Sequence, residues 1–135
     1  MALKFFPEQG SILICDFKGF NEPEMTKRRP VVVISPKRKN SPRLCTIVPL
    51  STTAPRPVER FHVQLKIEPS LPEPYDRSDC WAKCDMIYQV SFERLSLPCF
   101  GKLTNGERMY YQLPIGAEKL QEIRKAVAFA LGLHD

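Results

Sequence analysis

The stretch Lys27-Arg28-Arg29-Pro30-Val31-Val32-Val33-Ile34-Ser35-Pro36 decides how this chain is expected to fold. Three cations lead into a proline and then into an unbroken apolar, β-branched run. A short run of this kind between turn residues predicts a strand that is buried on both faces. Because such a strand is rigid, and because Pro30 restricts the residue before it to extended geometry, Arg29 is expected to hold a defined position.

A guanidinium in a fixed position suits phosphate, because its planar fork can donate two hydrogen bonds to two phosphate oxygens at once. The positive charge of the chain is also concentrated here. Between Met25 and Val58 lie eight of the 20 Lys and Arg and none of the 15 Asp and Glu. A localised basic field is typical of a protein with a polyanionic partner, most often nucleic acid. An acidic protein partner, or a basic loop with no partner, would give the same pattern.

Length and composition restrict the class of protein. The 135 residues fit one domain over 1–135, long enough to bury a core without disulfides or metal. Five cysteines are an odd number, so thiols are expected, and the cysteines in strand-like runs should be small core residues. No apolar run approaches the ~20 residues of a membrane span, and the N-terminus lacks the apolar centre of a secretory signal. A cytoplasmic protein with no membrane partner is expected.

The remaining patterns predict a mainly β chain of the α+β class, with short strands and a C-terminal helix. The proline content, 13 residues, suits a small barrel with sharp corners. The short basic connection after the central strand predicts an antiparallel partner, and residues 68–79, with three prolines and four acids, predict an exposed loop. Strands are predicted over 11–17, 30–35, 44–50, 61–67 and 80–90, a helical turn over 91–95 capped by Ser91, and a helix over 117–131 between Gly116 and Gly132.

Two further segments carry polar side chains suited to chemistry. Hydroxyl groups cluster at residues 51–53, just past the end of the strand over 44–50. In the strand over 80–90, Lys83 and Asp85 are expected on one face, because side chains repeat every two residues. An ordinary surface ion pair that contributes little is the alternative for Lys83 and Asp85. Trp81 beside them could stack on a base or simply belong to the core.

Two competing sites are weaker. Cys80 and Cys84 would point to the same face of a strand but too far apart for a zinc knuckle, so no metal site is predicted. His62 lies in an alternating strand, where a structural role is expected rather than a catalytic one.

Taken together, three segments resemble the MazF/PemK family of ribonuclease toxins from toxin–antitoxin pairs. The family's first signature, Lys/Arg-x-Arg-Pro followed by apolar residues, corresponds to residues 27–35. Its second, an apolar strand that ends Val-Pro-apolar-Thr/Ser, corresponds to residues 48–52. The Arg-Cys-Asp block of the PemK branch corresponds to Lys83-Cys84-Asp85. Order and spacing agree over roughly residues 9–97, and a family-like helix follows.

The resemblance implies a small SH3-like β-barrel with a C-terminal α-helix that acts as a homodimer. It also implies cleavage of single-stranded RNA without a metal or cofactor, by attack of the 2′-hydroxyl on the adjacent phosphorus. The products would carry a 2′,3′-cyclic phosphate and a free 5′-hydroxyl. A cognate antitoxin would be expected to neutralise the protein by laying an acidic segment over the basic groove.

The resemblance also implies roles for individual residues. Arg29 would stabilise the charged phosphorane, and Ser51 would hydrogen-bond the phosphate or assist proton transfer. Asp85 would be the general base and Lys83 an acid or charge stabiliser. Contacts to the rest of the RNA are expected from Lys27, Arg28, Lys37, Arg38, Lys39, Thr52 and Trp81.

This sequence departs from the family at three positions. Lys83 stands where the family has an arginine, and lysine is a point charge with a different reach. Ser51 replaces threonine, which is a mild change. The loop histidine of the PemK branch has no counterpart, because Pro23 or Glu24 falls there. A catalytically inactive barrel that binds nucleic acid or protein is therefore the alternative function.

Overall fold

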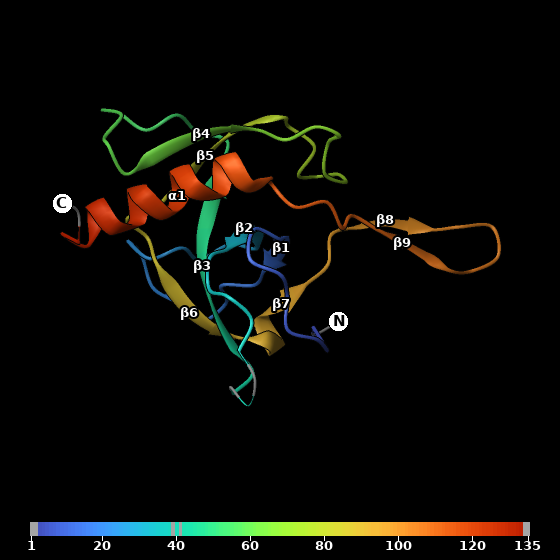
Figure 1. Ribbon diagram of the computed structural model, residues 1–135. Coiled ribbons are helices and arrows are strands. Elements are labelled where there is room, and N and C mark those ends of the chain that lie inside the picture. Colours follow the sequence, from blue (N-terminus) through green and yellow to red (C-terminus); the bar gives the residue numbers. More distant parts are fainter. Residues whose placement is uncertain (1–2, 39, 41, 134–135) are drawn as a thin grey trace.

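A computed structural model describes residues 3–38, 40 and 42–133 of the chain. The described residues form an antiparallel sheet of seven strands, a separate two-stranded hairpin and one long helix (Figure 1). In chain order the elements are β1 (Ile12–Cys15), β2 (Arg29–Val33), β3 (Leu44–Ser51), β4 (His62–Lys66), β5 (Asp79–Lys83), β6 (Tyr88–Ser91), the 3₁₀ turn η1 (Phe92–Arg94), β7 (Leu95–Ser96), β8 (Cys99–Lys102), β9 (Arg108–Tyr110) and α1 (Ala117–Ala130). The predicted mainly β fold with a C-terminal helix is confirmed.

The long strand β3 organises the sheet, whose order is β4-β5-β3-β2-β1-β7. The first half of β3, from Leu44 to Ile47, pairs with β6, and its last two residues pair with β5. One side of β3 is therefore shared by two strands, while its other side pairs with β2, antiparallel as predicted.

The prediction of one strand from Cys80 to Val90 is wrong, because the chain turns between β5 and β6. The backbone N–H of Met86 donates to the carbonyl of Lys83, and the N–H of Cys84 donates to the carbonyl of Phe61. Strand β5 pairs with β4 as well as with the end of β3, whereas β6 follows the beginning of β3. The apolar pattern of the sequence runs through this turn without a break, so periodicity could not reveal it.

Strand β2 is buried on both faces, as predicted. Val31, Val32 and Val33 are all 0% exposed. Val32 packs into a cluster on the side of the sheet that α1 covers, the helix-side cluster, together with Leu50 and Ile123. Val31 and Val33 pack into a second cluster on the other side, which the N-terminal segment and the loop before β2 complete.

The predicted ends of the helix are confirmed. Gly116 is its N-cap, and at the C-terminal end Gly132 has a φ of 74°, a left-handed conformation that glycine adopts readily. The N–H of Leu133 donates to the carbonyl of Ala128, which is a Schellman arrangement. The predicted Ser91 cap is also confirmed, since its side chain accepts a hydrogen bond from the N–H of Glu93.

Two features differ from the sequence-based picture. The loop over residues 68–79 is not exposed throughout, because Leu71 is only 3% exposed and belongs to the helix-side cluster. The hydroxyl of Tyr111 also donates a hydrogen bond to the carbonyl of Pro69 at 2.9 Å, which holds this loop against the body of the protein. The hairpin of β8 and β9, which projects from the body in Figure 1, was not predicted at all. Within the described ranges, no helix has the length and apolar character to span a membrane.

Ile47→Ala should lower the free energy of unfolding by about 2–5 kcal/mol, because Ile47 is fully buried in the second cluster. Urea denaturation followed by circular dichroism measures the change. Val58→Ala, at a position that is 55% exposed, is the control and should stay within about 0.5 kcal/mol of wild type. Equal losses in the two variants would contradict the assignment of the core.

Candidate active site

Arg29 and Ser51 meet at one end of the sheet. Strand β2 begins with Arg29, and its antiparallel partner β3 ends with Ser51. The antiparallel register pairs Val31 with Pro49. Moving two residues back along β2 and two residues forward along β3 therefore places Arg29 across from Ser51. The sheet thus joins residues that are 22 positions apart in the sequence. Both line a cavity of about 260 Å³.

The cavity combines cations, hydroxyl groups and an apolar floor. Arg28 and Arg29 reach it from the beginning of β2, and the hydroxyl-bearing residues 51–53 reach it from the end of β3. The loop over 68–79 also lines the cavity, with Tyr75 and Arg77, neither of which the sequence motifs indicated. The floor consists of residues that also belong to the helix-side cluster, namely Leu50, Ile67, Leu71 and Cys80.

Arg29 has an unused hydrogen-bond donor. Its Nε is buried and has no hydrogen-bond partner among the described residues. An unpaired buried donor is costly, and the cost is greater for a charged group. Arg29 also lines the cavity, so an anion bound there would balance its charge. The neighbouring Arg28 is instead held in a long, exposed ion pair, with its Nη2 3.6 Å from a carboxylate oxygen of Asp16.

Ser51 is oriented by the turn that follows β3. Its Oγ accepts a hydrogen bond from the backbone N–H of Thr53 at 3.2 Å, which leaves the hydroxyl proton free to donate. Directly across from Ser51 on β5 lies Trp81. Trp81 is partly exposed and belongs to neither hydrophobic cluster, which favours base stacking over the alternative of a core residue. Its position beside Ser51 suits stacking on a base.

Lys83 lies near Ser51 but outside the cavity. Because Trp81 pairs with Ser51, Lys83 is a diagonal neighbour of Ser51, with backbones about 7–8 Å apart. Asp85 follows in the exposed turn after β5. The expectation that Lys83 and Asp85 share a strand face is wrong, because the strand ends at Lys83. In the part of the chain that the structure describes, no ion pair joins them.

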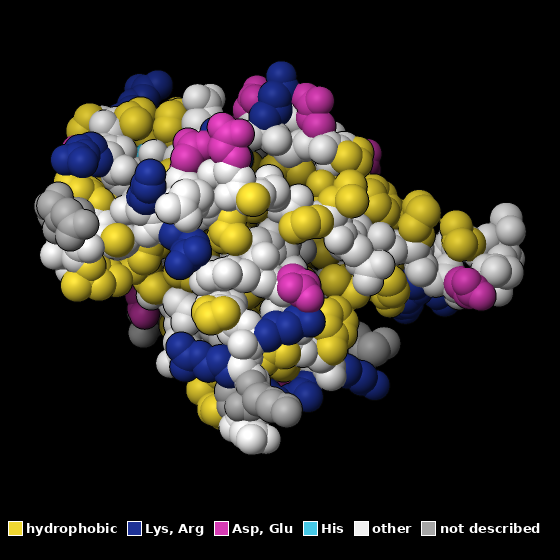
Figure 2. All heavy atoms as spheres, in the orientation of Figure 1, with side chains coloured by type: hydrophobic (Ala, Val, Ile, Leu, Met, Phe, Trp, Pro, Cys, Tyr) yellow, Lys and Arg dark blue, Asp and Glu magenta, His cyan; other side chains and the backbone are white. Residues whose placement is uncertain are grey.

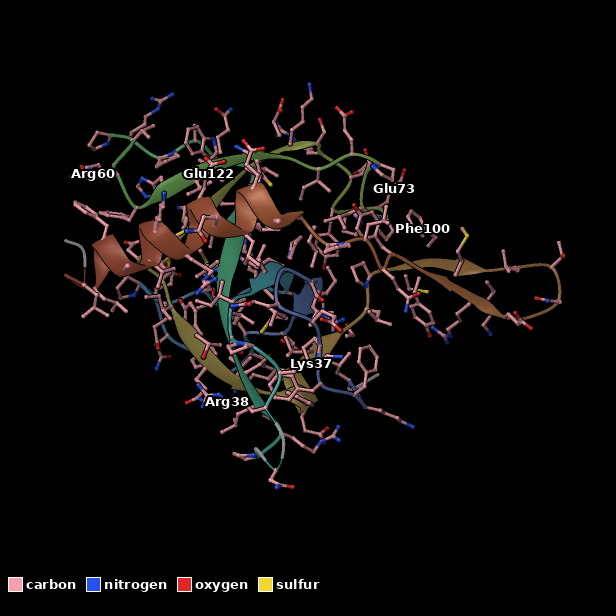
Figure 3. All side chains as sticks on the ribbon, in the orientation of Figure 1. Lys37, Arg38, Arg60, Glu73, Phe100 and Glu122 are labelled. Carbon is pink, nitrogen blue, oxygen red and sulfur yellow. The ribbon has the colours of Figure 1, made fainter. Side chains whose placement is uncertain are left out.

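The predicted basic segment is divided between the two ends of the sheet. Lys27, Arg28 and Thr52 lie at the Arg29 end. Lys37 and Arg38 lie in the connection between β2 and β3, at the opposite end (Figure 3). The Nζ of Lys37 pairs there with Glu8 at 2.7 Å. A β-hairpin necessarily separates its turn from its outer ends, so a single continuous basic groove over 27–43 is not formed. Lys39 lies outside the described residues.

The cysteines and the histidine in these strands have structural environments. Burial raises the pKa of Cys84 and Cys15 to about 12 and that of Cys80 and Cys45 to about 11, so these four thiols stay protonated at neutral pH. The Nδ1 of His62 accepts the backbone N–H of Glu59 at 2.9 Å. Across residues 3–38, 40 and 42–133 no three His, Cys, Asp or Glu side chains form a group that could hold a metal ion.

A family model described as the PemK-like, MazF-like toxin of type II toxin–antitoxin systems matches residues 8–130. The chain belongs to this family. Its relatives include the Escherichia coli (strain K12) protein YifN, which is 31% identical over 115 residues, covering 71% of this chain and 76% of YifN. The family match includes all three segments that resemble the MazF/PemK toxins.

Solved structures of MazF-like proteins share the fold. MazF from Deinococcus radiodurans (form I) has a TM-score of 0.63 at 17% identity, covering 96% of this chain and 99% of that one. An endoribonuclease from a mycobacterial species, solved in complex with its cognate antitoxin, has a TM-score of 0.62 at 18% identity, with 96% and 99% covered. MazE–MazF (form II) from D. radiodurans has a TM-score of 0.61 at 21% identity, with 97% and 100% covered.

Iodoacetamide at pH 8 should label Cys99 in the native protein and leave the other four cysteines unmodified, because only the thiolate reacts and Cys99 alone is partly exposed. Peptide mass spectrometry identifies the labelled site. Labelling in denaturant is the control and should modify all five. Native labelling of Cys84 would contradict the buried environment that anchors the end of β5.

Proposed function

We propose that this chain is an endoribonuclease toxin that cleaves single-stranded RNA without a metal ion or cofactor. Membership of the PemK-like, MazF-like family supports the reaction class. The observation that carries the proposal is the cavity that Arg29, Ser51 and Thr52 line together, with the Nε of Arg29 buried and without a hydrogen-bond partner among the described residues. These groups can bind a phosphodiester and stabilise the charge that develops on it.

In the proposed reaction, the 2′-oxygen of the RNA attacks the adjacent phosphorus and the bond to the 5′-oxygen breaks. Asp85 takes the proton of the 2′-hydroxyl, and Lys83 gives a proton to the departing 5′-oxygen. Arg29 and the hydroxyl of Ser51 donate hydrogen bonds to the non-bridging oxygens. No metal is needed, because the nucleophile belongs to the substrate. The scissile phosphate would sit at Ser51, between the cavity and Lys83.

Arg29→Ala should reduce kcat about 10²–10³-fold in EDTA, because one preorganised charge-stabilising group is lost. Gel analysis of a long, end-labelled RNA measures the rate. Arg38→Ala removes an equal charge at the opposite end of the sheet and is the matched control, with a rate close to wild type. Equal rates for Arg29→Ala and wild type would overturn the proposed role of the cavity.

Asp85→Asn should lower kcat by about 10²–10⁴-fold, the range for loss of a general base. The rate is measured under single-turnover conditions to separate chemistry from product release. Asp85→Glu, which keeps a carboxylate, should restore part of the rate. A wild-type rate in Asp85→Asn would assign the base to another group.

A barrel that only binds nucleic acid is the second candidate. It is favoured by the position of Lys83 and Asp85 outside the cavity and by the lack, among the described residues, of an ion pair between them. One measurement distinguishes RNA cleavage from RNA binding alone. RNA that binds to wild type and to Arg29→Lys, without any product in EDTA, would select the binding function.

Partners follow from the same proposal. The mycobacterial endoribonuclease and D. radiodurans MazF were each solved with an antitoxin. We therefore propose that an acidic antitoxin segment covers the Arg29 end of this sheet and that the active form is a homodimer. Sedimentation of the purified protein tests the dimer, and a co-expressed acidic protein that abolishes RNA cleavage tests the antitoxin.

A further inference from the structure

A second, larger cleft adjoins the Arg29 cavity. Its volume is about 490 Å³, within the ~300–1,000 Å³ range of ligand sites. Arg28 and Tyr75 line both the cleft and the cavity, so the two lie side by side. The side chains that line the cleft and suit a nucleic acid are Lys4, Phe5, Arg28, Tyr75, Arg108 and Tyr110.

The hairpin of β8 and β9 forms one wall of this cleft. Cys99 pairs with Tyr110 and Lys102 with Arg108, which places these four residues on one face of the hairpin. Met109 lies on the opposite face. The two faces differ in character, and Figure 2 shows basic side chains beneath the projecting hairpin and hydrophobic ones along its upper side. The basic, aromatic face borders the cleft.

We propose that this cleft binds the stretch of single-stranded RNA that adjoins the scissile phosphate, an inference that rests on the proposed function. Single-stranded nucleic acid is bound by cations that follow the backbone and by aromatic rings on which bases stack. Three cations and three aromatic rings around one cleft provide both. The shared residues Arg28 and Tyr75 favour RNA over an acidic peptide, because an RNA strand bound at Arg29 must leave the cavity and the cleft lies directly beside it.

Two carboxylates limit where phosphate can lie. Glu73 also lines the cleft, and its charge excludes phosphate from that wall and leaves it for base edges, whose amino groups can donate to a carboxylate. Asp16 pairs with Arg28 at 3.6 Å, but both side chains are exposed, so a phosphate can displace it at little cost.

The test uses uncleavable 2′-O-methyl oligonucleotides of three, six and nine nucleotides and measures binding by fluorescence anisotropy. Affinity for wild type should rise with length. Arg108→Ala/Tyr110→Ala should weaken binding of the longest probe by about tenfold or more and leave the shortest unchanged. The slope of log K against log salt should fall by about 0.7 for each phosphate that the variant no longer neutralises.

Two further variants separate cleft binding from damage to the hairpin. Lys4, in the N-terminal segment, also lines the cleft, so Lys4→Ala should likewise weaken binding of the longest probe. Met109→Ala is the matched control on the far face of β9 and should bind as wild type does.

The outcomes distinguish this proposal from the proposed function. If binding increases with probe length and the Arg108, Tyr110 and Lys4 variants weaken it, the proposed RNA-binding role of the cleft is supported, even if wild type cleaves no RNA. If these variants bind and cleave long RNA as wild type does, the proposed RNA-binding role of the cleft is wrong, while the proposed nuclease function is unaffected. Wild type that binds no oligonucleotide, or that binds an acidic peptide in the cleft instead, would overturn the proposed role of the cleft as well.

Discussion

The burial of β2 on both faces is the constraint on which the candidate site depends. Val31 and Val33 fill the cluster on one side of the sheet and Val32 fills the other, so a shift of the strand by one residue would exchange them between the clusters and disrupt the packing of both. Arg29 is the first residue of this strand, and its direction is therefore fixed by the core. The Nε of Arg29 is buried and has no hydrogen-bond partner among the described residues.

The second constraint is the register between β2 and β3. It brings a cation and a hydroxyl group together at one end of the sheet and sends the basic turn after β2 to the other end. The strong local charge of the sequence is therefore a poor guide to the shape of the binding surface. Charge near Arg29 comes from Arg28 and from Arg77 of a distant loop, while Lys37 pairs with Glu8 elsewhere.

Sequence patterns predicted the parts of the fold that local physics determines. The apolar run over 31–34, the Ser91 cap and the helix between Gly116 and Gly132 each have a local cause. Arg29 and Ser51 were indicated by the motifs that resemble the MazF/PemK family, and both line one cavity at the ends of β2 and β3. The break after Lys83 was missed because it follows from the pairing of β5 with β4, which periodicity does not encode. Tyr75 and Arg77 were missed because their loop has no regular pattern. The hairpin of β8 and β9 did carry a signal, since Asn105-Gly106 is a common hairpin turn.

The most direct test of this account is the Nε–H resonance of Arg29 in a ¹⁵N-labelled sample, assigned with Arg29→Lys. On addition of a 2′-O-methyl RNA oligonucleotide, this resonance should shift and its exchange with solvent should slow, because the buried N–H gains a phosphate oxygen as acceptor. The Nε–H of Arg38, at the other end of the sheet, should remain unchanged. A shift at Arg38 with none at Arg29 would contradict the account.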